Sequence, residues 1–527
     1  MDSSLHVYNT LTKQKEVFVP KEKDHVRMYV CGPTTYNFIH LGNARPIVVF
    51  DTIRRYLEYS GYKVTYIQNF TDVDDKIINK ANEEGESPIK LAARYINEYF
   101  IDADKLKVKR ADVHPKVSEH MDVIIDFVRE LEEKGYAYEV DGDVYFSVRK
   151  FADYGKLSGR SLDDLLAGAR VEVDQRKKDP LDFALWKKAK AGEPAWDSPW
   201  GPGRPGWHIE CSAMSNKYLG QEIDIHGGGY DLVFPHHENE IAQTEALLDV
   251  PMARYWLHNG FITVNQEKMS KSLGNFFLLR EILAKFDPMV VRFYLLSTHY
   301  RSPLDFDDEK LEVAQKGLDR LKNSYLQLGN SLKVAGNYEN GDKLKEVTLK
   351  AMDDFIEAMN DDFNTALAIA ALFDLARGIN TYLKESRLDK KTLEQAKSVF
   401  DDLIGVLGIS FTTREVQGGK LVEDLISLII TLRQKARKER DFTTADSIRD
   451  QLKELGIILE DGIKGTNWKA NGEMDGLIEK LIEMIIAIRQ NARKNKDFKT
   501  ADLIRDEMKK VGIIFEDTHQ GTNWKLE

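Results

Sequence analysis

Near the N-terminus the chain reads Val26-Arg27-Met28-Tyr29-Val30-Cys31-Gly32-Pro33, and this stretch decides the fold. Its first five residues include β-branched and aromatic side chains and predict a buried strand, which the glycine–proline pair ends. A helical pattern begins near Gly42 and runs to Tyr59, and a second strand is predicted over Tyr62–Asn69. A strand, a helix and a strand at this spacing predict a doubly wound α/β domain on a parallel sheet.

The chain has 527 residues, of which 42% are hydrophobic and 31% are charged. That length exceeds one ordinary hydrophobic core, so we expect two or more domains. The N-terminus lacks the pattern of a signal peptide, and no apolar run is long enough to span a bilayer. Two cysteines, Cys31 and Cys211, exclude a disulfide framework and fit a reducing compartment. We therefore expect a cytoplasmic protein without a membrane partner, and a monomer.

The α/β pattern is interrupted and then resumes. A hairpin-like stretch over Tyr136–Phe146 and a loop over Gly192–Gly206 predict an insertion, and the strand Glu222–Ile225 returns to the sheet. Helical periodicity from about 305 to 410 predicts a helical bundle. The domains that we expect are the two halves of the α/β domain (1–120 and 207–260), the connective insertion (121–206), a connecting region (261–305), the helical bundle (306–412) and two small C-terminal modules (421–469 and 477–527).

The C-terminal tail contains a tandem duplication. Residues 428–469 and 484–525 align without gaps, and 26 of the 42 aligned positions are identical. Lys and Arg outnumber Asp and Glu by 9 to 7 in the first copy and by 9 to 6 in the second, so the pair carries +5 within a total of −11. The basic residues gather in Arg433–Arg440 and Arg489–Lys496, each part of a predicted helix. Such clusters are either solvated helix faces or contacts to RNA phosphates.

Two short motifs suit a nucleoside triphosphate. The first, His40-Leu41-Gly42-Asn43, opens a helix whose N-terminus offers free N–H groups, and His40 can donate a hydrogen bond to a phosphate oxygen. The second, Lys268-Met269-Ser270-Lys271-Ser272, supplies two cations and two hydroxyls. Taken alone, a histidine at a helix start is more often a cap, and a short run of Lys and Ser is more often a surface loop.

A third segment, Asp224–Leu232, carries three successive glycines directly after a predicted strand. Glycines at the carboxyl end of a strand let the backbone lie against a flat base or ribose. Asp231 can accept hydrogen bonds from ribose hydroxyls. A glycine-rich turn without a ligand is an equal alternative.

Four side chains that are far apart in the sequence form a candidate metal site. Cys31 ends the first strand, Cys211 follows Trp207-His208-Ile209-Glu210, and His236 and Glu240 are four residues apart on a predicted helix. Residues at that spacing share a helix face. Two thiolates, an imidazole and a carboxylate make a four-ligand zinc site. The alternative is a pair of buried, inert cysteines.

The His-x-Gly motif near the start, together with Lys-Met-Ser-Lys-Ser after a split α/β domain, resembles the pattern of the class I aminoacyl-tRNA synthetases. Within that class the chain closely resembles the cysteinyl-tRNA synthetase family, from about residue 5 to the first tail copy. The resemblance is carried by Tyr29-Val30-Cys31-Gly32-Pro33-Thr34, Asn69-Phe70-Thr71-Asp72-Val73-Asp74-Asp75-Lys76, Trp207-His208-Ile209-Glu210-Cys211-Ser212-Ala213-Met214 and Phe234-Pro235-His236-His237-Glu238-Asn239-Glu240.

This resemblance implies a Rossmann catalytic domain that activates L-cysteine with ATP and transfers it to the 3′-terminal ribose of tRNA(Cys). It also implies Mg²⁺ with the ATP and one zinc ion that binds the substrate thiol, which separates cysteine from near-isosteric serine without an editing domain. The implied site residues are Cys31, Cys211, His236 and Glu240 for zinc, with His237 outside the set; His40, Asn43, Lys268 and Lys271 for catalysis; and Gly32, Gly42, Thr71, Trp207, His226, Gly228, Asp231 and Lys271 for ATP and the adenylate.

Two features depart from the family pattern. Asn43 stands where the first motif usually ends in a second histidine, so this side chain can donate a hydrogen bond but cannot carry a charge. The family pattern has one C-terminal module, and the second copy either adds RNA affinity, which we expect, or is a packing appendage.

Two other functions compete with this interpretation. A ligase that joins cysteine to a small amine would keep the zinc and phosphate motifs, but it would not need the helical region and the basic tail. A catalytically inactive RNA-binding protein would not need intact zinc and phosphate residues.

Overall fold

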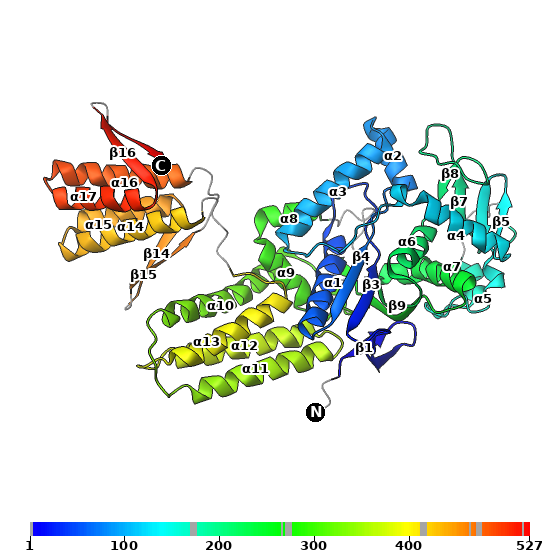
Figure 1. The fold of residues 1–527 in the computed structure, drawn as a ribbon, viewed down its shortest axis with the longest axis horizontal. Coiled ribbons are helices and arrows are strands. Elements are labelled where there is room, and N and C mark those ends of the chain that lie inside the picture. Colours follow the sequence, from blue (N-terminus) through cyan, green and yellow to red (C-terminus); the bar gives the residue numbers. More distant parts are fainter. Residues whose placement is uncertain are drawn as a thin grey trace. The chain divides into compact units, whose positions relative to one another are not determined.

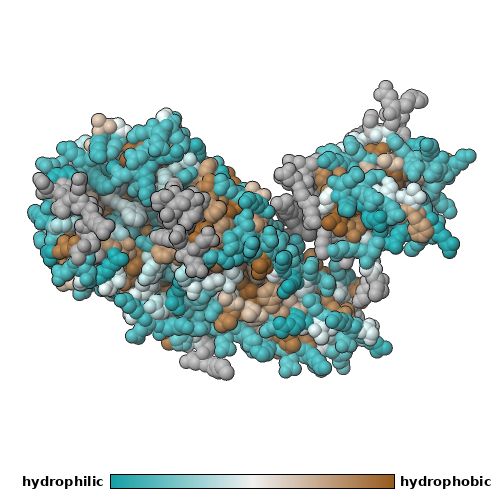
Figure 2. Space-filling view, turned by 180° about the vertical axis from the view of Figure 1, so that it is seen from behind, coloured by the Kyte–Doolittle hydropathy of each residue, from teal (hydrophilic) through white to brown (hydrophobic). Residues whose placement is uncertain are grey.

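A computed structural model describes residues 4–168, 176–264, 267–268, 277–411, 419–462, 465–470, 477–518 and 521–526. They form two compact units, Met1–Ser410 and Phe411–Glu527. The face drawn in Figure 2 is covered mainly by hydrophilic side chains. Within the described ranges no helix combines the length and the apolar character needed to cross a lipid bilayer.

The first unit is built on a four-stranded parallel sheet with the strand order β10-β9-β3-β4, which confirms the predicted α/β fold. Val26 and Val30 of β3 are fully buried, as expected for a parallel strand that is covered on both faces. Helix α1 packs against the sheet, and α6 and α7 lie on its other side (Figure 1). These elements are β3 (His25–Val30), α1 (Leu41–Tyr59), β4 (Lys63–Gln68), α6 (Ile209–Leu219), β9 (Ile223–Gly229), α7 (Glu238–Leu248) and β10 (Ala253–Asn259).

Smaller elements surround this sheet. An antiparallel hairpin precedes it, and two helices follow β4. Between these helices and α6 lies a segment with its own antiparallel sheet, in the order β5-β6-β7-β8. Helix α4 of that segment packs on α6 and α7, so the segment shares a hydrophobic core with these two helices. The elements are β1 (His6–Asn9), β2 (Gln14–Val17), α2 (Asp75–Glu84), α3 (Pro88–Lys105), α4 (Met121–Glu133), β5 (Ala137–Val140), β6 (Asp143–Phe146), α5 (Leu162–Gly168), β7 (Phe183–Lys188) and β8 (Gly203–Pro205).

After β10 the chain forms a three-stranded sheet, two short helices and a bundle of four helices. Arg292 of α9 is fully buried, donates to the backbone oxygens of Leu407 (2.7 Å) and Leu106 (2.9 Å), and pairs with Asp51 of α1. One guanidinium therefore ties the bundle to the sheet. The elements are β11 (Ile262–Val264), β12 (Glu267–Lys268), α8 (Leu279–Lys285), α9 (Pro288–Leu296), β13 (Leu304–Asp305), α10 (Asp308–Leu332), α11 (Asp342–Asn360), α12 (Thr365–Tyr382) and α13 (Lys390–Val406).

The second unit contains both tail copies, and each copy is two helices followed by a β-hairpin. The helices of the two copies pack on one another, and the hairpins lie on opposite outer sides of them (Figure 1). The first copy consists of α14 (Gly419–Lys438), α15 (Phe442–Glu454), β14 (Ile457–Gly462) and β15 (Gly465–Ala470), and the second of α16 (Leu477–Lys494), α17 (Phe498–Lys510), β16 (Ile513–Thr518) and β17 (Gly521–Leu526).

The basic tail clusters are only partly solvated. Arg433 is 3% exposed, and its guanidinium makes two hydrogen bonds to the Asp461 carboxylate, at 2.8 and 2.7 Å. Arg489, at the equivalent position of the second copy, is also buried. Neither alternative, a solvated helix face or a contact to RNA phosphates, fits the first residue of each cluster. In each cluster that arginine is part of the module's own packing.

Candidate active site and metal centre

A pocket of about 310 Å³ opens at the carboxyl ends of the parallel strands. Strands β3 and β9 are neighbours there, and β4 lies on the other side of β3. This is the place where open α/β sheets bind ligands, because loops leave neighbouring strands in opposite directions. The predicted site residues that line the pocket are Cys31, Gly32, His40, Gly42, Asn43, Thr71, Trp207, Cys211, Asp231 and His236.

Helix α1 begins at one wall of this pocket. His40 is its N-cap: Nδ1 of His40 accepts a hydrogen bond from the Asn43 N–H, and Oδ1 of Asn43 accepts one from the His40 N–H, both at 3.3 Å. This reciprocal capping fixes both side chains at the helix start. The positive end of a helix of 19 residues therefore borders the pocket, beside an imidazole that also lines it.

Arg45, just over one turn further along α1, holds another part of the pocket lining. It is fully buried and donates hydrogen bonds to the backbone oxygens of Gly260 (2.9 Å), Phe261 (2.9 Å) and Ser302 (2.6 Å). Burial lowers the pKa of Arg45 to about 10, so the guanidinium stays charged at neutral pH. Gly260 and Phe261 line the pocket, and their position thus depends on this arginine.

Gly32 is packed directly against the loop that follows β4. A Cβ atom at this position would lie 1.6 Å from the Asn69 backbone oxygen. The Asn69 side chain in turn accepts a hydrogen bond from the Gly32 N–H at 2.9 Å. No side chain fits there, so the glycine serves the close approach of two strand ends.

Thr71 connects the pocket to a buried acid. Its hydroxyl donates to Glu210 Oε1 at 2.6 Å, and Glu210 is 1% exposed. Burial raises the pKa of Glu210 well above its usual range. Its second oxygen, Oε2, has no hydrogen-bond partner among the described residues.

Cys31, Cys211 and His236 line the pocket, and Glu240 lies beside them. One ligand atom from each lies within 4.8 Å of the others. The two sulfur atoms are 3.6 Å apart, and His236 Nε2 is 3.0 Å from Glu240 Oε1. Two thiolates on one tetrahedral zinc lie about 3.8 Å apart, since each Zn–S bond is about 2.3 Å long. The donor types and the sulfur spacing therefore fit zinc.

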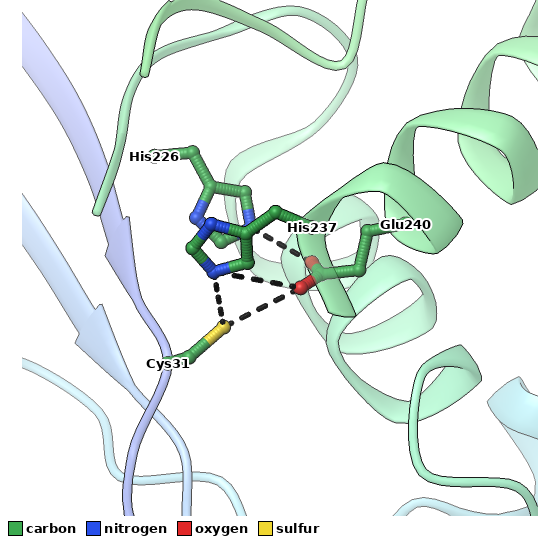
Figure 3. A group of neighbouring side chains, drawn as sticks. All are labelled: Cys31, His226, His237 and Glu240. Carbon is green, nitrogen blue, oxygen red and sulfur yellow. Dashed lines mark hydrogen bonds and ion pairs between the residues drawn. The ribbon is translucent and has the colours of Figure 1, made fainter. Parts of the chain in front are cut away.

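Other histidines approach the same carboxylate from behind. His226 Nε2 lies 2.7 Å from Glu240 Oε2, and His237 Nε2 lies 3.3 Å from Cys31 Sγ and 3.9 Å from Glu240 Oε1 (Figure 3). Cys31, His226, His237 and Glu240 thus form a second group that could hold a metal, and it shares two members with the first. His226 does not line the pocket, and the space above Gly228 is filled by the His237 ring.

Hydrogen bonds orient the imidazoles of both groups. His236 Nδ1 lies 3.0 Å from His208 Nδ1, which leaves Nε2 directed at Glu240. His237 Nδ1 lies 2.8 Å from His258 Nε2. Fixing one ring nitrogen determines which nitrogen faces a metal.

The ionisation of Glu240 and Cys211 favours binding of a cation in this cluster. Burial by itself raises the pKa of Glu240, but the neighbouring imidazoles reverse this and hold it well below its usual range. Burial raises the pKa of Cys31 well above its usual value. Burial acts in the same direction on Cys211, but the hydrogen bond from Cys31 and the His236 imidazole outweigh it and lower the pKa to about 6. Cys211 is therefore ready to act as a thiolate, the form that binds metals.

Family models and relatives match this chain over most of its length. A model described as "tRNA synthetases class I (C) catalytic domain" matches residues 17–316, a "DALR domain" matches 354–412, and a "Cysteinyl-tRNA ligase anticodon binding domain" matches 429–468. A cysteine–tRNA ligase of Desulforamulus reducens is 61% identical over 492 residues, which cover 89% of this chain and 100% of the relative. One of Heliobacterium modesticaldum is 62% identical, over 88% of this chain and 99% of the relative.

The chain belongs to the cysteine–tRNA ligase family. This confirms the family expected from the motifs, and the chain is a class I aminoacyl-tRNA synthetase. Solved structures agree on the fold. Methionyl-tRNA synthetase of Mycobacterium tuberculosis, in complex with methionyl-adenylate, has a TM-score of 0.52 at 15% identity over 73% of this chain and 89% of its own. A LeuRS from Agrobacterium radiobacter, in a ternary complex with tRNA, has a TM-score of 0.56 at 13% identity over 74% and 84%.

One predicted motif lies almost wholly outside the described residues. Lys271 and its neighbours in the Lys-Met-Ser-Lys-Ser motif lie outside the described residues, and of Lys268 only the backbone, in β12, is described. Conversely, reasoning from the sequence missed Arg45, Asn69, Glu210, His208 and His258. For Arg45 the only signal is a cation directly before the apolar run Pro46–Phe50. For the others the partner lies far away along the chain, so local spacing carries no signal.

Proposed function

We propose that this chain activates L-cysteine with ATP and transfers it to the 3′-terminal ribose of tRNA(Cys). One observation carries the proposal. Two thiols and an imidazole line the same pocket as the N-terminus of α1, and the Glu240 carboxylate lies within 4.8 Å of their ligand atoms. A soft-metal site and a phosphate site therefore face a single cavity. Family membership supplies the reaction that joins these two chemistries.

For the metal we propose one zinc ion, held by Cys31, Cys211, His236 and Glu240. This set contains both thiols, whereas the overlapping set with His226 and His237 contains one, and zinc prefers sulfur and nitrogen donors. Zinc, when bound, supplies a soft Lewis acid that favours a thiolate over an alcohol. The substrate would thereby be distinguished from serine, which pocket shape alone separates poorly.

At the phosphate end we propose that His40 and the first N–H groups of α1 stabilise charge on the α-phosphate, with Gly42 allowing close approach. Asn43 supports this wall through its reciprocal hydrogen bonds with His40. Lys268 and Lys271 are proposed to hold the leaving pyrophosphate, with Mg²⁺ bound to the ATP. These roles for the two lysines rest on the motif and the family.

Around the adenylate we propose contacts from Gly32, Thr71, Trp207 and Asp231, which all line the pocket. Trp207 lies beside the metal group, and the centroid of its ring is 4.5 Å from the centroid of the His236 ring. For His226 and Gly228 we propose an indirect role. His226 holds Glu240, and Gly228 leaves room for the ring of His237.

The remaining assignments concern the rest of the chain. We propose that the bundle of α10–α13 and the first tail copy bind the tRNA, because family models for a DALR domain and an anticodon-binding domain match these segments. We further propose that the protein is a monomer and acts in the cytoplasm, where two free cysteines are stable.

The test is charging of a tRNA pool with labelled cysteine, run beside cysteine-dependent ATP–pyrophosphate exchange. Both reactions are expected. Both should be lost on chelation and regained on addition of zinc. Exchange without charging would instead indicate a ligase for a small amine. Serine-dependent exchange at a rate near that of cysteine would contradict the zinc-based selectivity.

A further inference from the structure

The second tail copy shares one hydrophobic core with the first. Leu425 and Ile426 of α14 are fully buried, and so are Leu481 and Ile482 at the equivalent positions of α16. Helix α14 packs against both α16 and α17. Because the two copies present the same face to one another, the contact is self-complementary, as in a symmetric dimer.

An ion pair adds to this contact. Lys435 of the first copy lies 3.3 Å from the carboxylate of Asp497, the N-cap of α17 in the second copy. The position equivalent to Lys435 in the second copy is Asn491. Deleting the second copy would therefore uncover apolar positions of α14 as well as remove surface residues. Point substitutions separate these two effects.

The two copies share an exposed aromatic ring at one corner. Some of their equivalent apolar positions have changed identity, such as Leu452 to Met508 and Leu459 to Phe515. In contrast, Phe442 and Phe498 are identical and equally exposed, at 60% and 61%. Packing does not require a large aromatic ring in water at either place. An exposed ring that is present in both copies is a candidate contact for a partner.

Exposed cations flank each of these rings. Lys438 and Arg440 precede Phe442, and Lys494 and Lys496 precede Phe498. None of these four cations forms an ion pair with any residue that the structure describes.

The corner that carries these side chains has the same backbone in both copies. Arg440 and Lys496 both have a φ of 62°. The next residue donates back into the preceding helix, from Asp441 N to Ala436 O at 2.9 Å and from Asp497 N to Ala492 O at 2.8 Å. The end of one helix and the start of the next are thus held together, so the cations and the ring lie at one place on the surface.

We propose that Lys494, Lys496 and Phe498 form a second RNA-binding surface, which takes an unpaired RNA segment in the same way as the corner of the first copy. Cations neutralise backbone phosphates, and an exposed aromatic ring stacks on a base irrespective of its identity. The second copy carries +3, which suits this partner, within a chain of −11. This inference goes beyond the proposed function, since charging needs one anticodon contact and the first copy is the segment that the anticodon-binding family model matches.

The test uses the full chain and a fluorescein-labelled, unstructured oligoribonucleotide of mixed sequence, with anisotropy recorded at several salt concentrations. The variant is Lys494→Gln with Phe498→Ala, and its counterpart in the first copy is Lys438→Gln with Phe442→Ala. Lys496 is left in place, because its left-handed backbone restricts substitution. The matched control is Lys480→Gln with Leu503→Ala, which removes one exposed cation and one exposed apolar side chain. The equivalent positions in the first copy are Asp424 and Ser447, so neither control residue is shared by the two copies.

The second-copy variant is expected to bind the oligonucleotide about fivefold more weakly or worse. The slope of log affinity against log salt should become shallower by about 1. The control should bind as the unmodified chain does, and combining both copies' variants should weaken binding further. Unchanged binding by the second-copy variant, an equal loss in the control, or no binding by the unmodified chain would each overturn the inference. Cysteine-dependent ATP–pyrophosphate exchange involves no RNA and should be equal in all variants, so a failure of the proposed function would be seen separately.

Discussion

His226 and Glu240 are in contact inside the protein, with His226 Nε2 2.7 Å from Glu240 Oε2 and both side chains fully buried. The other oxygen of the same carboxylate, Oε1, faces the thiol side, 3.0 Å from His236 Nε2 and 3.4 Å from Cys31 Sγ. One carboxylate thus has an oxygen for the metal group and an oxygen held by a histidine behind it. His226 lines no part of the pocket, so its contribution is to orient Glu240.

This arrangement predicts that His226→Gln weakens zinc binding by about 10- to 100-fold, the usual effect of removing a residue that orients a metal ligand. Zinc release should be followed in a competition with a coloured chelator. His299→Gln, a histidine outside the metal groups, serves as the control. Equal retention of zinc by the His226 variant and the unmodified chain would contradict the role assigned to this contact.

Gly32→Ala is predicted to destabilise the first unit by about 3 kcal/mol or more, because overpacking a site that cannot relax is costly. The added Cβ would lie 1.6 Å from the Asn69 backbone oxygen. Gly329→Ala is the matched control, since nothing lies within 4 Å of its Cβ position in helix α10. This control should be stabilised by about 0.5–1 kcal/mol. Denaturant unfolding measures both changes. Equal midpoints for the two variants would contradict the tight packing of Gly32 against the Asn69 backbone.

Arg292→Met is predicted to cost about 3–5 kcal/mol, because it leaves the Asp51 carboxylate buried without its main partner. Asp51→Leu in the same chain should recover part of the loss, since it removes the orphaned charge. Arg377→Met, an exposed arginine whose side chain is 77% accessible, should change stability little. A full-sized loss in the double variant would instead assign the effect to the hydrogen bonds with Leu106 and Leu407.

His114 predicts a loss of stability on mild acidification. Burial lowers the pKa of His114 to about 4, whereas an unfolded histidine titrates near about 6.5. Between these values the unfolded state binds a proton that the folded state does not, so the free energy of unfolding falls as the pH falls. The contribution of neutral His114 to the free energy of unfolding is fully present above about pH 6.5. About 2 kcal/mol of it is lost by about pH 5.

The measurement is urea unfolding at pH 7.5 and pH 5, comparing the unmodified chain with His114→Gln. The variant should lose about 2 kcal/mol less than the unmodified chain between the two pH values. His6→Gln serves as the control for a histidine elsewhere on the first unit. Parallel losses in all three proteins would mean that burial of His114, including its packing against Phe70, does not hold it neutral.

The sequence by itself determined the type and order of the main elements. The strand at Val26–Val30, the helix to Tyr59 and the following strand were predicted within a few residues of β3, α1 and β4. These elements are set by local periodicity and by glycine and proline, which act over a few residues. The family was also readable from short motifs, since each motif is contiguous. Matches to cysteine–tRNA ligases over 88–89% of the chain confirm it.

Only the tertiary structure decided which side chains meet and which face water. His236 and His237 precede Glu240 by four and three residues, and both spacings place a residue on the same helix face, so the sequence could not separate their distances to Glu240. Likewise Arg433 lies in a basic cluster by sequence, yet it is buried against Asp461, 28 residues away. Charge and periodicity are properties of a segment. Burial, orientation and partners are set by packing between segments that the chain brings together only when it folds.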